Sequence, residues 1–496
     1  MSPVITKSRY INGVQCPAFL WLEINAPEKI PEPNAPTLHR MEEGTKVGEF
    51  ATKLYSEGIA IPTKDFNENL AQTQILLKKR KPLFEPGFKF STPDGDTYAR
   101  IDLLVPAGKD RWDILEVKSG TKVKPINVHD VAFQKYVCEK SGLKIRKCIL
   151  CHVNNEFIKK GEIKPENFFV AEDVCEEVDE LYGGVENNIK RFFEVVKLKE
   201  CPKVTPEDIL NAEYSNIAID EFYDSLPEDN VFEMIGWGPK KGIKIYQEGM
   251  IKIEDVPENF KMNEKQKIQR KCVIDGKCHS DKEKIKEFLE GLKYPLYYLD
   301  FETFNEVIPR FEGAKPYQQI PFQFSLHVVK KKGDKPKHIS FLADGGEDPR
   351  LKFLRKLKES LGSEGDVVVY NEGFEKRIIR ECIDAFPEFK DWGNGILNRI
   401  VDLLHPFKNF HFYHPDQKGS ASIKKVLPIF SKDVNYDDLV IGNGEDASIS
   451  YLKSHFEDTP AEEKAKIRDA LEKYCELDTY AEILLVEGLR EIVDGK

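Results

Sequence analysis

Carboxylates in two distant parts of this sequence have the spacing that a divalent-cation site needs. Asp102 is followed by Glu116 and Lys118, and an Asp300-Phe-Glu302 pair is followed much later by further acids. Phosphodiester hydrolysis needs a hard cation that activates water and screens charge, and carboxylate oxygens suit Mg²⁺ or Mn²⁺. Either pattern alone could be accidental. Together they indicate metal-dependent hydrolysis as the chemistry to test.

The first set lies on two expected strands. Asp102 is the one acid among apolar residues at the end of a strand, and Glu116 and Lys118 stand at i and i+2 of the next strand, so they point to the same side. Asp102 and Glu116 could therefore share a cation, while Lys118 could orient water or stabilise the pentacoordinate phosphorus. Glu49, on the preceding expected helix, could add an outer ligand. The alternative is a strand-edge salt bridge.

The second set combines a strand with a helix. A buried-strand pattern ends in Asp300 and Glu302, which project to one face as a two-metal site requires. Tyr474 and Asp478 are four residues apart in an expected helix over 464–492 and share a face of it. Tyr474 could position the attacking water while Asp478 completes the metal cage.

A fourth carboxylate is expected between these two segments. The strand pattern over 367–370 runs into a helix, and Asn371 or Glu375 could reach the metals from there. Asp402 also ends a strand pattern. It is the alternative fourth ligand.

Apolar periodicity predicts an α/β protein with mixed sheets in two domains joined by a helical connector. Residues 1–200 alternate strands and helices, with one strand expected over 98–105 and a helix over 128–140. Residues 201–290 contain short helical pieces between acidic and proline-containing stretches. A second run of strands and helices over 291–496 predicts the second domain.

Composition limits the class of protein. The chain has 496 residues, 10 cysteines and a formal net charge of −11, which argues against a protein that coats nucleic acid electrostatically. Lysine clusters at 78–81 and 330–337 are either local substrate contacts or solvated faces. No apolar run is long enough to span a membrane, and we expect a cytoplasmic protein with reduced thiols and no membrane partner.

The order of the first set is that of a known superfamily. Asp102, Glu116 and Lys118, followed by a helix with Gln134 and Tyr136, resemble the PD-(D/E)XK nucleases, specifically the RecB-like branch that includes CRISPR-associated exonucleases. That resemblance implies a restriction-endonuclease-like fold and an active site built from these residues. The usual Gln-x-x-x-Tyr spacing is here Gln-Lys-Tyr, which is a departure from the family pattern.

The cysteines differ from those of many relatives in that branch. The Ser8…Cys16-Pro17 segment is similar to the N-terminal motif that precedes the family core, where one cysteine joins three later ones in an iron–sulfur cluster. No compact trio of cysteines follows here, and Cys148 and Cys151 fall in an expected strand, where buried core cysteines are favoured. We therefore expect no iron–sulfur cluster.

The second set resembles a different superfamily. Asp300 with Glu302, Asn371 through Glu375, and Tyr474 with Asp478 are similar to the three motifs of DnaQ-like exonucleases of the RNase H-like superfamily. Glu375 stands where that family normally has Asp. The segment from 294 to 492 also resembles an uncharacterised prokaryotic domain fused to RecB-like nucleases. Within it, Ser420 or Ser422 caps an expected helix that, with Lys424 and Lys425, would suit a phosphate or would be an ordinary capped surface helix.

The resemblances imply a nuclease with two active sites that acts on DNA, with single-stranded or frayed ends favoured, and with a helicase or defence-system protein as a possible partner. One alternative is a non-catalytic nucleic-acid-binding scaffold in a repair or defence complex. Another is an RNA-processing exonuclease, which a preference for a 2′-OH substrate would distinguish.

Overall fold

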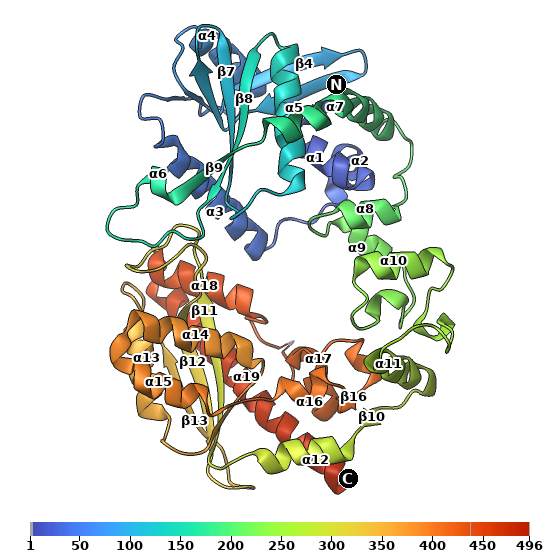
Figure 1. Cartoon of the computed structure of the whole chain (residues 1–496), viewed down its shortest axis with the longest axis vertical. Coiled ribbons are helices and arrows are strands. Elements are labelled where there is room, and N and C mark those ends of the chain that lie inside the picture. The colour runs from blue at the N-terminus through green and yellow to red at the C-terminus, as the bar shows by residue number, and fades with distance from the viewer. Residues whose placement is uncertain (1–2, 437, 496) are drawn as a thin grey trace. The chain divides into compact units, whose positions relative to one another are not determined.

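The computed structural model describes residues 3–436 and 438–495 and divides into two compact units (Figure 1). The first unit comprises the chain up to Leu226 together with Glu306–Tyr317, and the second comprises Pro227–Asn305 and the chain from Gln318 onward. Both units are mixed α/β structures, as predicted. None of the described helices is long and apolar enough to cross a membrane.

The expected boundaries at 200 and 290 differ from these units. The predicted connector is divided between them at Leu226. Its first helices carry apolar residues such as Ile219, which pack on Cys16 and Leu22 of the first unit. The segment Glu306–Tyr317, which lies inside the predicted second domain, belongs to the first unit because Val307 joins that unit's core. Short apolar faces thus decided where each segment packs.

The first unit contains a six-stranded sheet in the order β2-β3-β6-β7-β8-β9 and a three-stranded sheet in the order β1-β5-β4. The central pair β7 and β8 is parallel, whereas β6 and β9 run antiparallel to their neighbours β7 and β8. The strands are β1 Val4–Thr6, β2 Ile59–Ala60, β3 Leu83–Phe84, β4 Gly87–Thr92, β5 Gly95–Arg100, β6 Leu103–Ala107, β7 Arg111–Lys118, β8 Lys144–Val153 and β9 Phe169–Asp173.

Helices cover both faces of the six-stranded sheet. Leu115 of β7 packs with Val47 and Ala51 of α3, whereas Ile114 packs with residues of α5 and α7 on the opposite face. Glu116 and Lys118 follow Ile114 at steps of two, so both point toward α5. The helices are α1 Lys7–Gln15, α2 Pro17–Asn25, α3 Ala35–Thr52, α4 Phe66–Leu77, α5 Pro125–Lys140, α6 Pro165–Phe168, α7 Cys175–Val196, α8 Pro206–Asn211 and α9 Ile217–Asp224.

The single strand expected over 98–105 is wrong. The chain instead forms β5 in the small sheet and β6 in the large one, and Asp102 lies in the junction between them. The apolar pattern is continuous because the residues on both sides of the junction are buried, so periodicity alone did not reveal the change of sheet.

The second unit is built on a five-stranded sheet in the order β13-β12-β11-β14-β15. Strand β12 runs antiparallel to β11 and β13, while β11, β14 and β15 are parallel. A two-stranded ribbon pairs β10 with β16. The strands are β10 His279–Ser280, β11 Leu296–Phe304, β12 Ile320–Val329, β13 Lys337–Leu342, β14 Asp366–Val369, β15 Ile400–Asp402 and β16 Phe412–Tyr413.

Alternate residues of β11 face different helix layers. Leu299 and Phe301 pack with α13, α14 and α15, whereas Leu296 and Tyr298 pack with α12, α17 and α19. Asp300 and Glu302 continue the second series and therefore face α19. The helices are α10 Pro239–Gln247, α11 Glu264–Asp275, α12 Lys282–Gly291, α13 Arg350–Ser360, α14 Glu372–Ala385, α15 Lys390–Leu397, α16 Leu404–Lys408, α17 Ile423–Phe430, α18 Gly444–Phe456 and α19 Ala461–Asp494.

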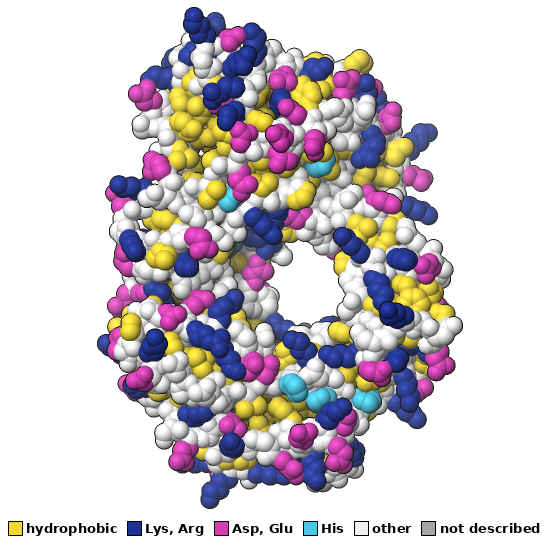
Figure 2. Space-filling model, in the orientation of Figure 1, with side chains coloured by type: hydrophobic (Ala, Val, Ile, Leu, Met, Phe, Trp, Pro, Cys, Tyr) yellow, Lys and Arg dark blue, Asp and Glu magenta, His cyan; other side chains and the backbone are white. Residues whose placement is uncertain are grey.

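Charge is distributed without one dominant basic region on the visible face. Figure 2 shows Lys and Arg side chains interspersed with Asp and Glu there, in keeping with the net charge of −11. Lys78 and Lys79 are exposed, and Lys81 pairs with Glu57 at 3.7 Å. Such a surface favours local contacts with a polyanion over wrapping.

Candidate functional site

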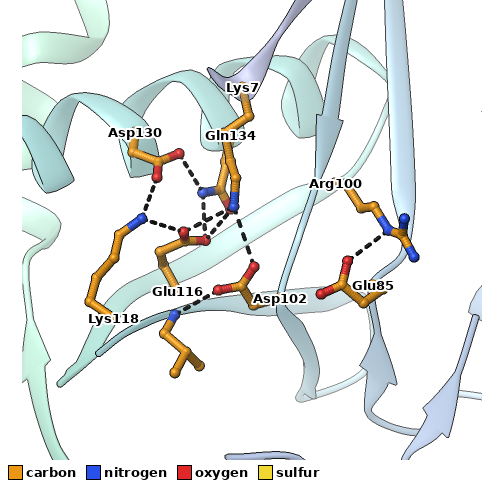
Figure 3. A network of polar contacts seen from close by, with 9 residues as sticks. Lys7, Glu85, Arg100, Asp102, Glu116, Lys118, Asp130 and Gln134 are labelled. Carbon is orange, nitrogen blue, oxygen red and sulfur yellow. Dashed lines mark hydrogen bonds and ion pairs between the residues drawn. The ribbon is translucent and has the colours of Figure 1, made fainter. Parts of the chain in front are cut away.

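The first cluster forms where β7 faces α5 (Figure 3). The Lys118 ammonium lies 2.7 Å from a Glu116 oxygen and 2.7 Å from an oxygen of Asp130. The Gln134 amide donates to Glu116 at 2.7 Å and to Asp130 at 2.9 Å. Asp102 is held beside them because one of its oxygens accepts the backbone N–H of Val117 at 2.9 Å. The predicted set of Asp102, Glu116, Lys118 and Gln134 thus meets in one place.

Two members of this cluster were missed by sequence reasoning. Asp130 precedes Gln134 by four residues on α5, and this i,i+4 spacing was the signal that could have found it. Lys7, the first residue of α1, reaches in from the N-terminal segment. Its ammonium lies 3.3 Å from Asp102 and 2.9 Å from Glu116. Nothing local to Lys7 predicts this contact.

Two predicted members lie elsewhere. Glu49 is exposed on α3, and α3 covers the face of the sheet opposite Glu116, so Glu49 does not reach the cluster. The Tyr136 hydroxyl donates to Glu186 of α7 at 3.3 Å. Because Tyr136 follows Gln134 by only two residues, a helix places the two side chains on different faces.

Charges in the first cluster nearly compensate each other. Burial, followed by the nearby Glu116 carboxylate, raises the pKa of Asp102 to about 7. Burial would also raise the pKa of Glu116, but Lys118 and Lys7 outweigh it and hold that pKa well below its usual range. The carboxylates of Asp102, Glu116 and Asp130 thus face the ammonium groups of Lys7 and Lys118. These two lysines neutralise most of the negative charge of the cluster.

The second cluster gathers on the α19 side of β11. Single ligand atoms of Asp300, Glu302 and Cys475 all lie within 4.8 Å of one another. Asp478 follows Cys475 on α19, and the Tyr436 hydroxyl donates to its carboxylate at 2.6 Å. Asp478 is near both strand acids, since after burial it is the largest cause of the raised pKa of Asp300 and of Glu302.

Tyr474 lies in the same cluster and is buried. Its hydroxyl hydrogen bonds to Asp478, and this bond opposes the burial that raises the pKa of that carboxyl. The Lys424 ammonium lies 5.5 Å from the centre of the Tyr474 ring and donates to the carbonyl of Gly442. Ser422 is the N-cap residue of α17 as expected, but its side chain makes no capping hydrogen bond.

Sequence reasoning missed Glu482, which is 1% exposed on α19. It follows Asp478 by four residues, so helical spacing was again the available signal. Burial, and then the neighbouring Asp300 and Glu375 carboxyls, raise the pKa of Glu482 well above its usual range. It adds a further acid to the cluster.

The structure separates the two candidates for the fourth carboxylate. Asp402 accepts the backbone N–H groups of Asn371 at 3.0 Å and Leu404 at 2.9 Å, which is a local capping role. Glu375, in the first turn of α14, is among the carboxyls that raise the pKa of Asp300. Glu375 thus interacts electrostatically with Asp300, whereas the hydrogen bonds of Asp402 go to the local backbone.

The second cluster is short of positive charge. Burial raises the pKa of Asp300 and Glu302 well above their usual range, that of Glu375 to about 8 and that of Asp478 to about 6. Within the part of the chain that the structure describes, one oxygen of Glu375 and one of Glu482 are buried without a hydrogen-bond partner. Lys424 only partly offsets the effect of burial on the pKa of Glu302 and Asp478. Apart from the Cys475 thiol, the donors of this cluster are carboxylate oxygens, which fit hard divalent cations.

This charge excess predicts an unusual pH dependence of stability in EDTA. A carboxyl whose pKa is higher in the folded than in the unfolded protein keeps its proton longer when folded, so the free energy of unfolding falls as pH rises from about 4 to about 8. The slope is up to about 1.4 kcal/mol per pH unit for each such carboxyl. Thermal unfolding midpoints measured across this range should therefore decrease with pH. Midpoints that rise instead would contradict the raised pKa values of these buried acids.

Cys475 lies in the second acidic cluster, and Cys151 lies near Asp102 and Glu116 of the first. Cys148 and Cys151 are buried in β8, as expected of core cysteines. Cys16 is buried at the start of α2, and the Cys201 thiol contacts the carbonyl of Ala18 at 3.6 Å. Burial raises the pKa of Cys16 to about 11.

A family model described as a domain of unknown function, DUF2779, matches residues 297–422. The matched segment includes Asp300, Glu302, Glu375 and Asp402 and ends before Asp478. The chain is also similar to two curated proteins. Uncharacterized protein MG366 of Mycoplasma genitalium is 28% identical over 228 residues, which are 42% of this chain and 34% of that protein. Uncharacterized protein UU173 of Ureaplasma parvum is 28% identical over 224 residues, which are 41% of this chain and 32% of that protein. The chain thus spans about a third of the length of these curated relatives.

Two solved structures are similar to part of the chain. SSO0001 is 10% identical and has a TM-score of 0.21, with 38% of this chain and 76% of that chain covered. A protein from Eubacterium rectale named "Putative exonuclease" is 12% identical and has a TM-score of 0.27, with 45% and 94% covered. The segment from residue 297 to 422 is the part of the chain that is similar to a named domain family, DUF2779.

Proposed function

We propose that this protein is a Mg²⁺- or Mn²⁺-dependent nuclease that hydrolyses phosphodiester bonds of DNA at two separate centres, one in each unit. The observation that carries the proposal is the second cluster, in which Asp300, Glu302, Glu375, Asp478 and Glu482 converge, with Lys424 near Glu302 and Asp478. Buried carboxylates without paired cations are costly, so such an arrangement favours a bound metal.

The residues of each unit fit such ions. Asp300, Glu302 and Asp478 would hold them in the second centre, and Asp102 with Glu116 in the first. Bound Mg²⁺ or Mn²⁺ lowers the pKa of a coordinated water and screens phosphate charge. The sheet order of the second unit, with β11 central and β12 antiparallel to it, also supports the RNase H-like resemblance.

Other side chains hold these groups in place. The Tyr436 and Tyr474 hydroxyls donate to Asp478 and fix its orientation. In the first centre Asp130 and Glu116 hold the Lys118 ammonium, and the Lys118 side chain is 27% exposed. A fixed ammonium there would stabilise negative charge as it develops on the phosphorus oxygens.

DNA with single-stranded or frayed ends is the proposed substrate, on the strength of the family resemblances, and unwinding would come from a helicase or a defence-system partner. Lys7 favours a second candidate for the first unit alone. Its ammonium already neutralises Asp102 and Glu116, so this cluster could serve as a non-catalytic support for nucleic-acid binding while the second unit cuts.

A substrate panel tests the proposal. Single- and double-stranded DNA and RNA, labelled at each end, are incubated with the full chain in Mn²⁺ or in EDTA. We expect cleavage of single-stranded DNA in Mn²⁺ and none in EDTA. Binding of DNA without cleavage under every condition would favour the scaffold, and preferred cleavage of RNA would favour the RNA-processing alternative.

Lys118→Ala should impair only the first centre. In a background that carries Asp300→Asn, we expect the remaining cleavage to fall about a hundredfold or more, because one positioned charge at a reacting group contributes about 3 kcal/mol. Lys147→Ala, which removes an exposed lysine paired with Asp173 on the neighbouring strand, is the matched control. An unchanged rate in the Lys118 variant would support the non-catalytic candidate for this unit.

A further inference from the structure

A second type of side-chain cluster lies on the same sheet of the second unit. His327 of β12, His338 of β13 and Glu476 of α19 each offer a ligand atom, and these atoms all lie within 4.8 Å of one another. The three elements are labelled in Figure 1. None of these residues belongs to the acidic cluster, and the proposed nuclease chemistry does not use them.

Hydroxyl groups orient both imidazole rings. His338 Nε2 lies 3.0 Å from Ser325 Oγ, and His327 Nδ1 lies 2.8 Å from Thr479 Oγ1. The two hydroxyls are 2.7 Å apart, and Thr479 Oγ1 donates to the backbone carbonyl of Glu476 at 3.1 Å.

The backbone carbonyl of Glu476, at the end of this series of hydrogen bonds, determines which atom donates in each of them. A carbonyl only accepts, so Thr479 donates to Glu476, Ser325 donates to Thr479, and each histidine donates an N–H to its hydroxyl. That assignment leaves a lone pair on Nε2 of His327 and on Nδ1 of His338. Metal-binding histidines are typically held in this way, with the second ring nitrogen donating to an oxygen outside the metal site.

Burial and charge also suit a bound cation. His327 is 4% exposed, so packing holds its ring in place, and the Glu476 carboxylate supplies negative charge at the site. The side chains of His338 and Glu476 are 27% and 49% exposed, so ions can enter from solvent. Ser325, Thr479 and the ring of Tyr480, at 6.0 Å from His327, complete the surroundings.

The spacing fits a tetrahedral ion. His338 Nδ1 and a Glu476 oxygen are 3.5 Å apart, and two ligands about 2.1 Å from a tetrahedral Zn²⁺ lie about 3.4 Å apart. Two imidazole nitrogens with one carboxylate favour Zn²⁺ and related transition metals, whereas all-oxygen sets favour Mg²⁺.

We infer that His327, His338 and Glu476 form a transition-metal site of the Zn²⁺ class, with a fourth position open to solvent. The ion would join α19 to β12 and β13. Ser325 pairs with Asp300 across the sheet, and Thr479 directly follows Asp478. The ion would therefore brace the two elements that carry the acidic cluster, and its binding does not require that cluster to be catalytic.

Co²⁺ binding to the full chain tests this site. The parent protein carries Asp300→Asn and Asp478→Asn, and excess Mg²⁺ is present, so that hard-cation sites contribute no signal. We expect one equivalent of Co²⁺ to bind with a visible absorption band typical of nitrogen ligation and to be displaced by Zn²⁺.

Single variants identify the ligands. His338→Ala and Glu476→Gln should each weaken Co²⁺ binding by more than about a hundredfold, and Ser325→Ala, which keeps all three ligands, by about tenfold. His405→Ala is the control, since His405 is an exposed histidine of the same unit that contacts Asn409. Glu476 is exposed, so its variant reports on the site without a risk to folding.

Two results would overturn the inference. One is a parent protein that binds no Co²⁺ under these conditions. The other is a band and affinity that survive in both ligand variants. Neither result bears on nuclease activity, which the substrate panel measures separately.

Discussion

Replacing Asp478 by asparagine is expected to reduce Mn²⁺-dependent cleavage by the second unit at least about a thousandfold, because a metal-held transition state loses several kcal/mol of stabilisation. The same change should leave the protein at least as stable in EDTA. Asp478 adds negative charge to a buried group of acids near Lys424, and the uncharged amide removes part of the repulsion among these acids. Stabilisation by Mn²⁺ should disappear together with activity.

The measurement combines cleavage of labelled single-stranded DNA with thermal unfolding in EDTA and in Mn²⁺, in a background that carries Lys118→Ala to silence the first centre. Asp469→Asn is the matched control because Asp469 lies on the same helix in an exposed ion pair with Lys473. If Asp478→Asn cleaves like its parent, the second centre is wrongly assigned. A large loss of stability in EDTA would contradict the charge excess.

Replacing Glu116 by glutamine is expected to destabilise the protein, in contrast to Asp478→Asn, and also to remove the activity of the first unit. Glu116 is 1% exposed and contacts both Lys7 and Lys118. Loss of its charge removes an ion-pair partner from both ammonium groups, and breaking a buried ion pair in this way costs about 3 kcal/mol. Cleavage that remains in an Asp300→Asn background should become undetectable.

Chemical unfolding followed by tryptophan fluorescence reports this change, since Trp112 lies on the same strand as Glu116. Asp110→Asn is the control because Asp110 forms an exposed ion pair with Lys144 beside that strand, and such pairs contribute little. A Glu116→Gln protein as stable as its parent would show that the lysines find other partners. Glu116→Gln thus tests whether lysines neutralise the carboxylates of the first cluster, and Asp478→Asn tests whether the second cluster has an excess of negative charge.

The pairs of residues that define each cluster were predictable because their spacing is local. Residues at i and i+2 of a strand share a face, which placed Glu116 with Lys118 and Asp300 with Glu302. Residues at i and i+4 of a helix share a face, which placed Asp478 near Tyr474. The long C-terminal helix was expected over 464–492 and extends over Ala461–Asp494.

Several members of the clusters were decided by tertiary packing. Lys7 reaches Glu116 across 109 positions of sequence, and no local pattern records such a contact. Glu49 was assigned to the first cluster from the order of elements alone, but order does not say which face of the sheet a helix covers. The choice of Glu375 over Asp402 likewise depends on how α14 packs beside β11.

The domain organisation was likewise predictable only where it depends on short segments of the sequence. The sequence alone determined an α/β chain with two groups of strands, since periodicity is a property of short segments. Only the tertiary structure assigned Glu306–Tyr317 to the first unit, where the Val307 N–H donates to Glu43 at 3.0 Å. Backbone geometry sets which residues of one helix or strand share a face. Which helices and strands pack against each other depends on burial of apolar residues that are distant in the sequence, and no local pattern records those contacts.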